Sequence, residues 1–257
     1  MNDYNLRDLT MAGVQWEITD VPFVLATAAA ATATESTHPT NNSAPTRTQT
    51  SIVPPIAPTQ PLSVDTAVAM AARPTDMDAL CRMIAEFNHP LRAAVTNVVL
   101  PHRAPNPNGL VIITDIPGTD DDATGQILTG PAGELLDKML AAIGMSRDNV
   151  SILPLLFWRT PGGRTPTASE LELARPFVNR VLELLQPRMI LTLGTLAAQE
   201  IAHVSLSREH DIMIAPGDAT PIMPIFHPSY LILKPTAKRD TWGALQQVEK
   251  LLKSADK

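Results

Sequence analysis

Four segments of this 257-residue chain carry side chains that could do chemistry. Two of them, TDIPGTDDD (114–122) and HPSYLILKP (227–235), contain a carboxylate at Asp115 and an imidazole at His227. The carboxylate can position a water molecule, and the imidazole can donate to negative charge that develops on a leaving group. Together they would form a minimal catalytic pair.

The third segment, FWRTPGGRTPT (157–167), resembles a rigid turn that brings the backbone close to an anion. Arg159 and Arg164 flank its Pro-Gly-Gly turn, and guanidinium and backbone N–H groups are the donors that hold a phosphate. The alternative is a structural turn whose arginines pair with a nearby carboxylate, such as Glu170 or Glu172.

The elements that must position these segments alternate along the chain. Apolar runs predict strands and helical spacing predicts helices, with strands at 109–114, 150–153, 188–194 and 221–226, and helices at 131–145, 168–185 and 240–252. Another helix opens the domain, with Thr75 as its predicted N-cap. This alternation predicts an α/β fold with a mainly parallel sheet and helices on both faces. The ligand crevice of such a sheet lies beyond the carboxyl ends of its strands, where GTLAA (194–198) joins the other three segments.

Composition divides the chain into three parts. Residues 1–25 predict a short helix, either a brace on the domain or a peptide that binds a protein partner. Residues 26–75 are rich in Ala, Thr, Pro and Ser and cannot bury enough apolar surface to fold, so we expect a disordered linker. Residues 76–257 are the predicted folded domain.

Charge and cysteine content exclude several classes of protein. A net charge of −6 excludes a polycation that coats nucleic acid, so a nucleic-acid partner requires a local basic patch. The single cysteine, Cys81, excludes an intramolecular disulfide framework and an all-cysteine metal cage. The apolar stretch at 21–34 follows acidic rather than basic residues, so we expect a cytoplasmic protein without a signal peptide or membrane span.

Four motifs, in this order and spacing, resemble the family 4 uracil-DNA glycosylases and their wider superfamily. They are DIPGTDDDATGQILTGPAGELLDKMLAAIG (115–144), WRTPGGRTPT (158–167), LTLGTLAAQ (191–199) and HPSYLILKPTAKRDTW (227–242). The resemblance implies a three-layer α/β/α sandwich with a central four-stranded, mainly parallel sheet. It also implies base excision repair, in which the enzyme flips a damaged base out of DNA and hydrolyses its glycosidic bond.

The chain departs from the family where the base is recognised. Residues 114–118 stand in place of Gly-Glu-Ala-Pro-Gly, so the carboxylate of Asp115 is one methylene shorter. Leu128 replaces a stacking Phe, and Pro154 and Gly163 replace two asparagines. Pro154 has no side-chain amide and no backbone N–H. By resemblance, the base pocket comprises Ile116, Pro117, Gly118, Leu128, Pro154 and Gly163.

The family's iron-sulfur cysteines are also absent. Trp158 and Ala174 stand where two of them fall, and residues 87–92 cover the region of the others. We therefore expect no cluster and no other metal or cofactor.

The last motif is expected to contact DNA. Residues 227–240 hold three cations and one anion, a net charge of +2 with the histidine neutral, and the family inserts the corresponding apolar loop into the duplex. With the arginine loop, the expected DNA contacts are Arg159, Arg164, Ser229, Tyr230, Leu231, Lys234, Lys238 and Arg239. The acidic residues 120–122 oppose this by repelling phosphate, and we interpret them as a solvated loop rather than a cation site.

These observations predict a glycosylase that removes uracil or another deaminated base, with weakened or altered specificity. Its partner would be DNA that contains the damaged base. The alternatives are a catalytically inactive DNA-binding descendant and a scaffold that recruits a partner protein through residues 1–25.

Overall fold

The computed structural model describes residues 62–206, 213–214 and 220–254. The predicted helix at 1–25 and most of the predicted linker lie outside these residues. All elements discussed below belong to the unit formed by residues 56–257.

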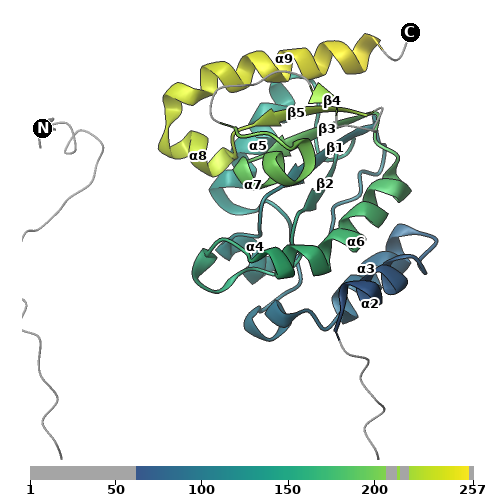
Figure 1. The fold of residues 1–257 in the computed structure, drawn as a ribbon. Coiled ribbons are helices and arrows are strands. Elements are labelled where there is room, and N and C mark those ends of the chain that lie inside the picture. Colours follow the sequence, from purple (N-terminus) through teal and green to yellow (C-terminus); the bar gives the residue numbers. More distant parts are fainter. Residues whose placement is uncertain (1–61, 207–212, 215–219, 255–257) are drawn as a thin grey trace, which may run out of the picture. The chain divides into compact units, whose positions relative to one another are not determined.

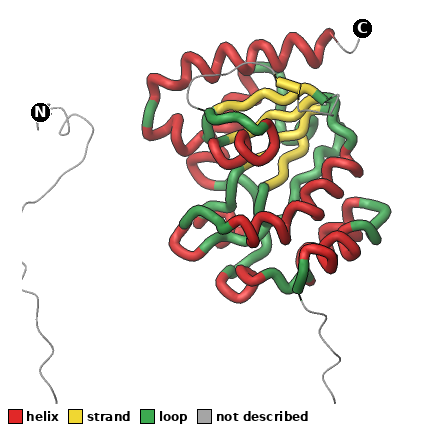
Figure 2. The backbone as a smooth tube through the Cα atoms, viewed as in Figure 1, coloured by secondary structure: helices red, strands yellow, loops and turns green. Residues whose placement is uncertain are grey.

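A parallel sheet lies at the centre of this unit (Figures 1 and 2). Its strand order is β2-β1-β3-β5-β4, and the first four of these strands run parallel. The two-residue strand β4 is antiparallel to β5 and adds an edge that the sequence analysis did not predict. The strands are β1 (Leu110–Thr114), β2 (Ser151–Pro154), β3 (Met189–Leu193), β4 (Met213–Ile214) and β5 (Pro221–Ile225). The predicted four-stranded, mainly parallel sheet is confirmed.

Helices cover both faces of the sheet (Figure 1). The larger ones are α2 (Val64–Ala71), α3 (Met77–Glu86), α5 (Gly130–Ala142), α6 (Ala168–Leu185) and α9 (Lys238–Ser254). Shorter turns connect them, namely η1 (Pro90–Ala94), α4 (Thr119–Thr124), η2 (Pro161–Gly163), α7 (Thr195–Ala197), η3 (Ala198–Ala202), α8 (Pro228–Leu233) and η4 (Pro235–Ala237).

Alternating residues of each strand feed two separate cores. Val111 and Ile113 pack with α2, α3 and α6, whereas Leu110 and Ile112 pack with α5 and α9. Strand side chains that are buried on both faces require the continuous apolar runs seen in the sequence. The result is the expected three-layer α/β/α arrangement.

Two sequence predictions at the start of the domain are wrong. Helix α2 lies inside the predicted linker, because Ala67 and Ala71 are small enough to pack against α6 and its N-cap Ser63 accepts from Thr66 N. Helix α3 is capped by Asp76, not Thr75, since the Asp76 carboxylate accepts from Ala79 N at 2.8 Å.

An aromatic cluster joins the N-terminal helices to the loop after β2. The His89 ring stacks on Trp158 with centroids 4.3 Å apart and planes inclined by 3°. Phe87 contacts both Trp158 and Phe177, at centroid distances of 5.9 and 4.8 Å. Phe87, Trp158 and Phe177 are fully buried, so the cluster is a continuous part of the core.

We expect Trp158→Ala to lower the free energy of unfolding by about 3–5 kcal/mol, because it leaves a large cavity beneath the loop that carries Arg159. Trp242→Ala is the matched control, since Trp242 is 41% exposed and should lose about 1 kcal/mol or less. Urea denaturation measures both. Equal losses in the two variants would contradict a structural role for the cluster.

Candidate active site

A cavity of about 590 Å³ opens beyond the carboxyl ends of the strands. Its walls come from the β1–α4 turn, the α4–α5 loop, the loop around η2, and α8. Five of the six predicted base-pocket residues line it, and they are Ile116, Pro117, Gly118, Leu128 and Gly163. The sixth, Pro154, is buried at the end of β2 and is not part of the wall.

His227 lies on the cavity wall, where β5 leads into α8. Its Nδ1 accepts from the Ser229 backbone N–H at 3.2 Å, so the imidazole serves as the N-cap of α8. Its Nε2 lies 3.1 Å from Thr114 Oγ1, on the end of β1. Burial lowers the pKa of His227, and the nearby Asp121 carboxylate partly opposes this, so the ring is neutral near pH 7.

Asp115 lies at the same edge of the sheet but bonds to a different element. Its Oδ1 accepts from Ala197 N at 2.6 Å, at the start of the helical turns after β3. Gly194 leaves room for this, because a Cβ there would overlap the Asp115 carboxylate. Burial raises the pKa of Asp115 to about 6, opposed by the backbone N–H groups of Ala197 and Leu196. The carboxylate therefore does not share a hydrogen bond with His227.

Asp121 is a site residue that the sequence analysis missed. It is 7% exposed and lines the cavity, and its Oδ2 accepts from Gly118 N at 2.9 Å. Its Oδ1 accepts from both the backbone N–H and the hydroxyl of Thr129, at 2.7 and 2.9 Å. Asp121 thus ties two walls of the cavity together. Its position three residues after the Pro-Gly turn is a capping signal that could have identified it.

The acidic run is therefore not a solvated loop throughout. Besides Asp121, the Asp122 Oδ1 accepts from the backbone N–H groups of Thr96 and Asn97, at 2.9 and 3.1 Å. These two carboxylates are used to hold loops in place. Within the described ranges, no group of His, Cys, Asp and Glu side chains could hold a metal ion.

Leu128 forms part of the cavity wall in a strained backbone conformation, with φ of 51°. Arg147 holds this turn by donating to the carbonyls of Ile127 and Leu128, at 2.9 and 2.6 Å. Gly133 also supports it, since a Cβ there would overlap the Leu128 carbonyl. The aliphatic side chain is therefore held in place on the cavity wall by the surrounding contacts.

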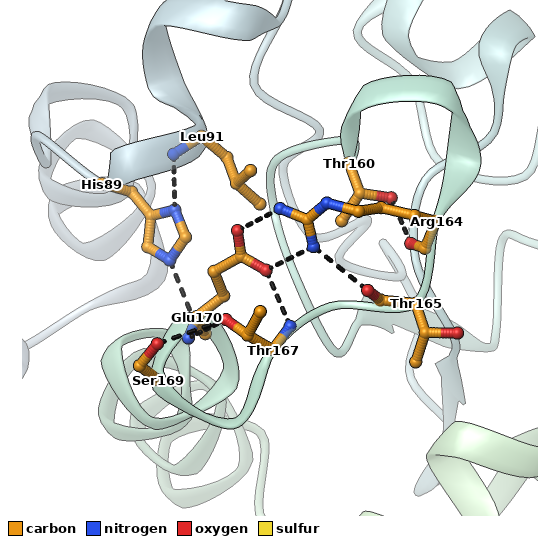
Figure 3. Close-up of polar contacts among 8 residues, drawn as sticks. All are labelled: His89, Leu91, Thr160, Arg164, Thr165, Thr167, Ser169 and Glu170. Carbon is orange, nitrogen blue, oxygen red and sulfur yellow. Dashed lines mark hydrogen bonds and ion pairs between the residues drawn. The ribbon is translucent and has the colours of Figure 1, made fainter.

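The two arginines of the η2 loop differ in their partners, and Figure 3 shows the partners of Arg164. Arg164 binds the Glu170 carboxylate through both terminal nitrogens, at 2.9 and 2.5 Å, and lowers the pKa of Glu170 to about 2. Glu170 also accepts from Thr167 N at 2.7 Å, as part of the capping box that starts α6. The structure therefore shows the alternative expected for Arg164, an ion pair with Glu170.

Arg159 remains available for an anion. It is half-buried on the cavity wall and forms no ion pair with another residue in the described part of the chain. Its neighbour Thr160 fastens the loop by donating to the Arg164 carbonyl at 2.6 Å. The loop thus presents one guanidinium rather than two.

Helix α8 presents an apolar edge beside the cavity. Ser229 and Tyr230 are exposed, and the Lys234 ammonium lies 5.9 Å from the Tyr230 ring centroid. Leu231, an expected DNA contact, is 1% exposed and packs inward, so that expectation is wrong. Helical geometry turns the next two side chains outward instead, and Leu233 is 84% exposed. Lys238 and Arg239 are exposed at the start of α9.

An iron-sulfur cluster does not fit the residues around the aromatic cluster. Such clusters are held by cysteine thiolates, and this chain has one cysteine, the half-buried Cys81 on α3. Trp158 and Ala174 are both fully buried and offer no thiolate to iron. Within the described ranges, no helix is long and apolar enough to cross a membrane.

The sequence matches known proteins in the region that forms this site. The profile of the uracil DNA glycosylase superfamily matches residues 101–247. A type-4 uracil-DNA glycosylase of Archaeoglobus fulgidus is 30% identical over 151 residues, 55% of this chain and 76% of that protein. The Thermotoga maritima type-4 enzyme is 32% identical over 126 residues, 48% and 66% respectively. That of Pyrobaculum aerophilum is 33% identical over 93 residues, 36% and 47%.

The raised pKa of Asp115 predicts a pH-dependent cost to stability. The pKa rises from 3.8 to about 6 on folding, so this group stabilises the fold least once it is ionised above about pH 6. We expect Asp115→Asn to remove this cost. The free energy of unfolding of the variant should therefore rise relative to that of the parent by up to about 3 kcal/mol between about pH 4 and pH 7. Urea denaturation across this range measures the difference, and a gap that does not grow with pH would contradict it.

Proposed function

The chain belongs to the uracil DNA glycosylase superfamily, and from this premise we propose that it is a DNA-repair glycosylase. It would hydrolyse the N-glycosidic bond of uracil or another deaminated base flipped out of DNA. The observation that carries the proposal is the neutral His227 imidazole on the wall of a cavity large enough for one base.

The reaction requires negative charge on the leaving base to be stabilised. As the bond between the sugar carbon and the base nitrogen breaks, the base takes the electron pair. Water then adds its oxygen to the sugar carbon, and the proton that it loses neutralises the departed base anion. A neutral imidazole can donate a hydrogen bond from Nε2 to an oxygen of the leaving base. His227 is the residue we assign to this role.

The Asp115 carboxylate is the candidate for the sugar side of the reaction. With a pKa of about 6 it is mostly ionised near neutral pH, so its charge favours an oxocarbenium-like sugar and can orient water. Its bonds to the turn after β3 fix its position. Single-turnover rates should therefore fall as the pH drops through about 6 and Asp115 becomes protonated.

Specificity for uracil should be weakened or altered. Leu128 gives an aliphatic wall where an aromatic ring would contribute roughly 1–3 kcal/mol of stacking per base. Pro154 offers no amide to the cavity, and a site without a polar partner loses the roughly 10⁴- to 10⁵-fold discrimination that such a partner provides. The described cavity supports recognition by shape more than by hydrogen bonds.

DNA would approach from the side of the cavity formed by Arg159 and α8. Arg159 can hold a phosphate, and the exposed cations Lys234, Lys238 and Arg239 provide a local basic patch on an acidic protein. The exposed Ile232 and Leu233 take the wedge role that we expected of Leu231. Residues 1–25 remain a candidate peptide for a protein partner, and the cytoplasm remains the expected location.

We further propose that the enzyme works without an iron-sulfur cluster. The stacked His89 and Trp158 rings, together with Ala174, would provide the support that thiolates and iron provide in the family. Nothing in the proposed chemistry uses a metal.

A second candidate, an inactive DNA-binding descendant, is favoured by one observation. Both ring nitrogens of His227 and the Asp115 carboxylate are bonded within the protein rather than free in the cavity. Salt-dependent DNA binding without excision would support this candidate.

Excision is tested with oligonucleotides that carry uracil, hypoxanthine or xanthine, single- and double-stranded, with protein in excess. We expect slow cleavage after alkali treatment, and a loss of about 10²- to 10³-fold in His227→Ala because a transition-state donor is removed. The exposed His203 provides a control, since His203→Asn should keep the parental rate. No cleavage of any substrate would defeat the proposal.

The two loop arginines should contribute differently to DNA binding. We expect Arg159→Ala to weaken binding and to lower the slope of log affinity against log salt by about one, the amount for one phosphate contact. Arg164→Ala should leave that slope unchanged, because Glu170 already neutralises Arg164. Lys253→Ala, at the far end of α9, is the control. Equal slope changes for both arginines would refute this assignment.

A further inference from the structure

His227 faces the cavity with both ring nitrogens already bonded. Nδ1 accepts from the Ser229 backbone N–H at 3.2 Å, and Nε2 lies 3.1 Å from Thr114 Oγ1. The ring itself forms part of the cavity wall. The nitrogen needed for catalysis is therefore engaged by a side chain that lies outside the wall.

These two contacts determine which nitrogen carries the proton. A backbone N–H can only donate, so Nδ1 is the acceptor and holds no proton in the neutral ring. Nε2 therefore carries the proton and donates a hydrogen bond to Thr114 Oγ1. Base excision requires this tautomer, but the Nε2–H group is already hydrogen-bonded to the Thr114 hydroxyl instead of being free for the base.

Thr114 holds this hydroxyl in a fixed place. It is the last residue of β1, lies level with Pro154 on β2 and Leu193 on β3, and is 2% exposed. A β-branched side chain has few accessible rotamers, and this one is enclosed by the sheet. The hydroxyl therefore cannot swing away, so any change of partner must come from His227.

On the premise of the proposed glycosylase activity, we propose that Thr114 is a positioning residue that holds the His227 Nε2 proton until a stronger acceptor arrives. That acceptor is the base oxygen on which negative charge develops. A hydrogen bond to a charged oxygen is about twice as strong as one to a neutral hydroxyl, so the exchange favours the leaving base over the intact one.

The consequence is a form of substrate selection. An intact, neutral base competes poorly with Thr114 for the hydrogen bond from His227 Nε2. A leaving base with negative charge on an oxygen near Nε2 accepts this hydrogen bond in place of Thr114. Interactions made only in the transition state raise the chemical rate without tightening binding of the intact base. The substrate class is therefore an oxygen-bearing deaminated base, not a base that presents only amino groups at this position.

Thr114→Val tests the idea, because it keeps the shape and removes the hydroxyl. In this variant His227 Nε2 no longer has to break a hydrogen bond before it binds the base. We therefore expect single-turnover excision to become about two- to tenfold faster, which corresponds to the net free energy of one hydrogen bond. Thr114→Ser restores the hydroxyl and should show a smaller gain. Thr192→Val is the matched control, since its buried hydroxyl has no partner among the described residues, and its rate should equal the parent's.

A second measurement does not depend on activity. The imidazole ring of His227 is observed by ¹⁵N NMR in the full chain. We expect the hydrogen-bonded Nε2 proton in the parent, Thr192→Val and Thr114→Ser, and its loss to rapid exchange in Thr114→Val. Thermal unfolding confirms that each variant is folded.

The outcomes separate this inference from the proposed function. A folded Thr114→Val that is no faster than the parent, or that keeps the parental Nε2 signal, overturns the role of Thr114. If no protein excises any base, the glycosylase proposal fails, and the NMR result alone still shows whether the hydroxyl holds the ring.

Discussion

The level register of β1, β3 and β5 is the constraint on which the candidate site depends. Parallel pairing places Thr114 beside Leu193, and Leu193 beside Ile225, so the residues after each strand emerge at one edge of the sheet. Gly194, directly after β3, has φ of 104° and no side chain. This bare position leaves room for the Asp115 carboxylate on one side, while the imidazole of His227 reaches past the end of β3 to β1. A slip of one residue in either pairing would move the ends of β1 and β5 out of level, turn the slipped strand's side chains to the opposite face and break the contact between Thr114 and His227.

Support for the η2 loop comes from packing and one ion pair rather than from covalent cross-links. Trp158 anchors the start of the loop between His89 and Phe87, and the Arg164 pair with Glu170 anchors its end on the first turn of α6. His89 completes the connection, because its Nε2 lies 3.0 Å from the Glu170 carbonyl (Figure 3). Burial lowers the pKa of His89, so this ring remains a neutral stacking partner. Arg159 lies between the two anchors, which explains how one guanidinium can be held at the cavity without a carboxylate of its own.

The sequence predicted the sheet, the main helices and most of the cavity wall because these follow from apolar periodicity and motif order. Predictions from the sequence were wrong where specific hydrogen bonds decide between two arrangements that composition does not distinguish. Arg164 could face a phosphate or Glu170, and only the capping box at Thr167 fixes that carboxylate within its reach. Leu231 looked like part of an exposed loop because the helical turn of α8, which buries it, has no clear periodicity in so short a segment. Thr114 was noted as a departure from the family motif, yet no pattern in the chain reveals that a residue 113 positions away shares its hydroxyl.

The polar groups around the cavity are mostly satisfied within the protein, and this limits how the site can recognise a ligand. On the wall, Asp121 accepts hydrogen bonds from Gly118 and Thr129, and His227 is bonded at both nitrogens. Asp115, which is not part of the wall, bonds to the turn after β3. Apart from the Arg159 guanidinium, the charged and imidazole side chains named above already have partners, so a ligand gains from them only where it offers a better partner than the one it displaces. A neutral base offers little advantage over a fixed hydroxyl, whereas developing charge offers a large one. Pre-satisfied polar groups therefore favour the transition state over the bound base, which allows a cavity with few recognition groups to remain selective for chemistry rather than for binding.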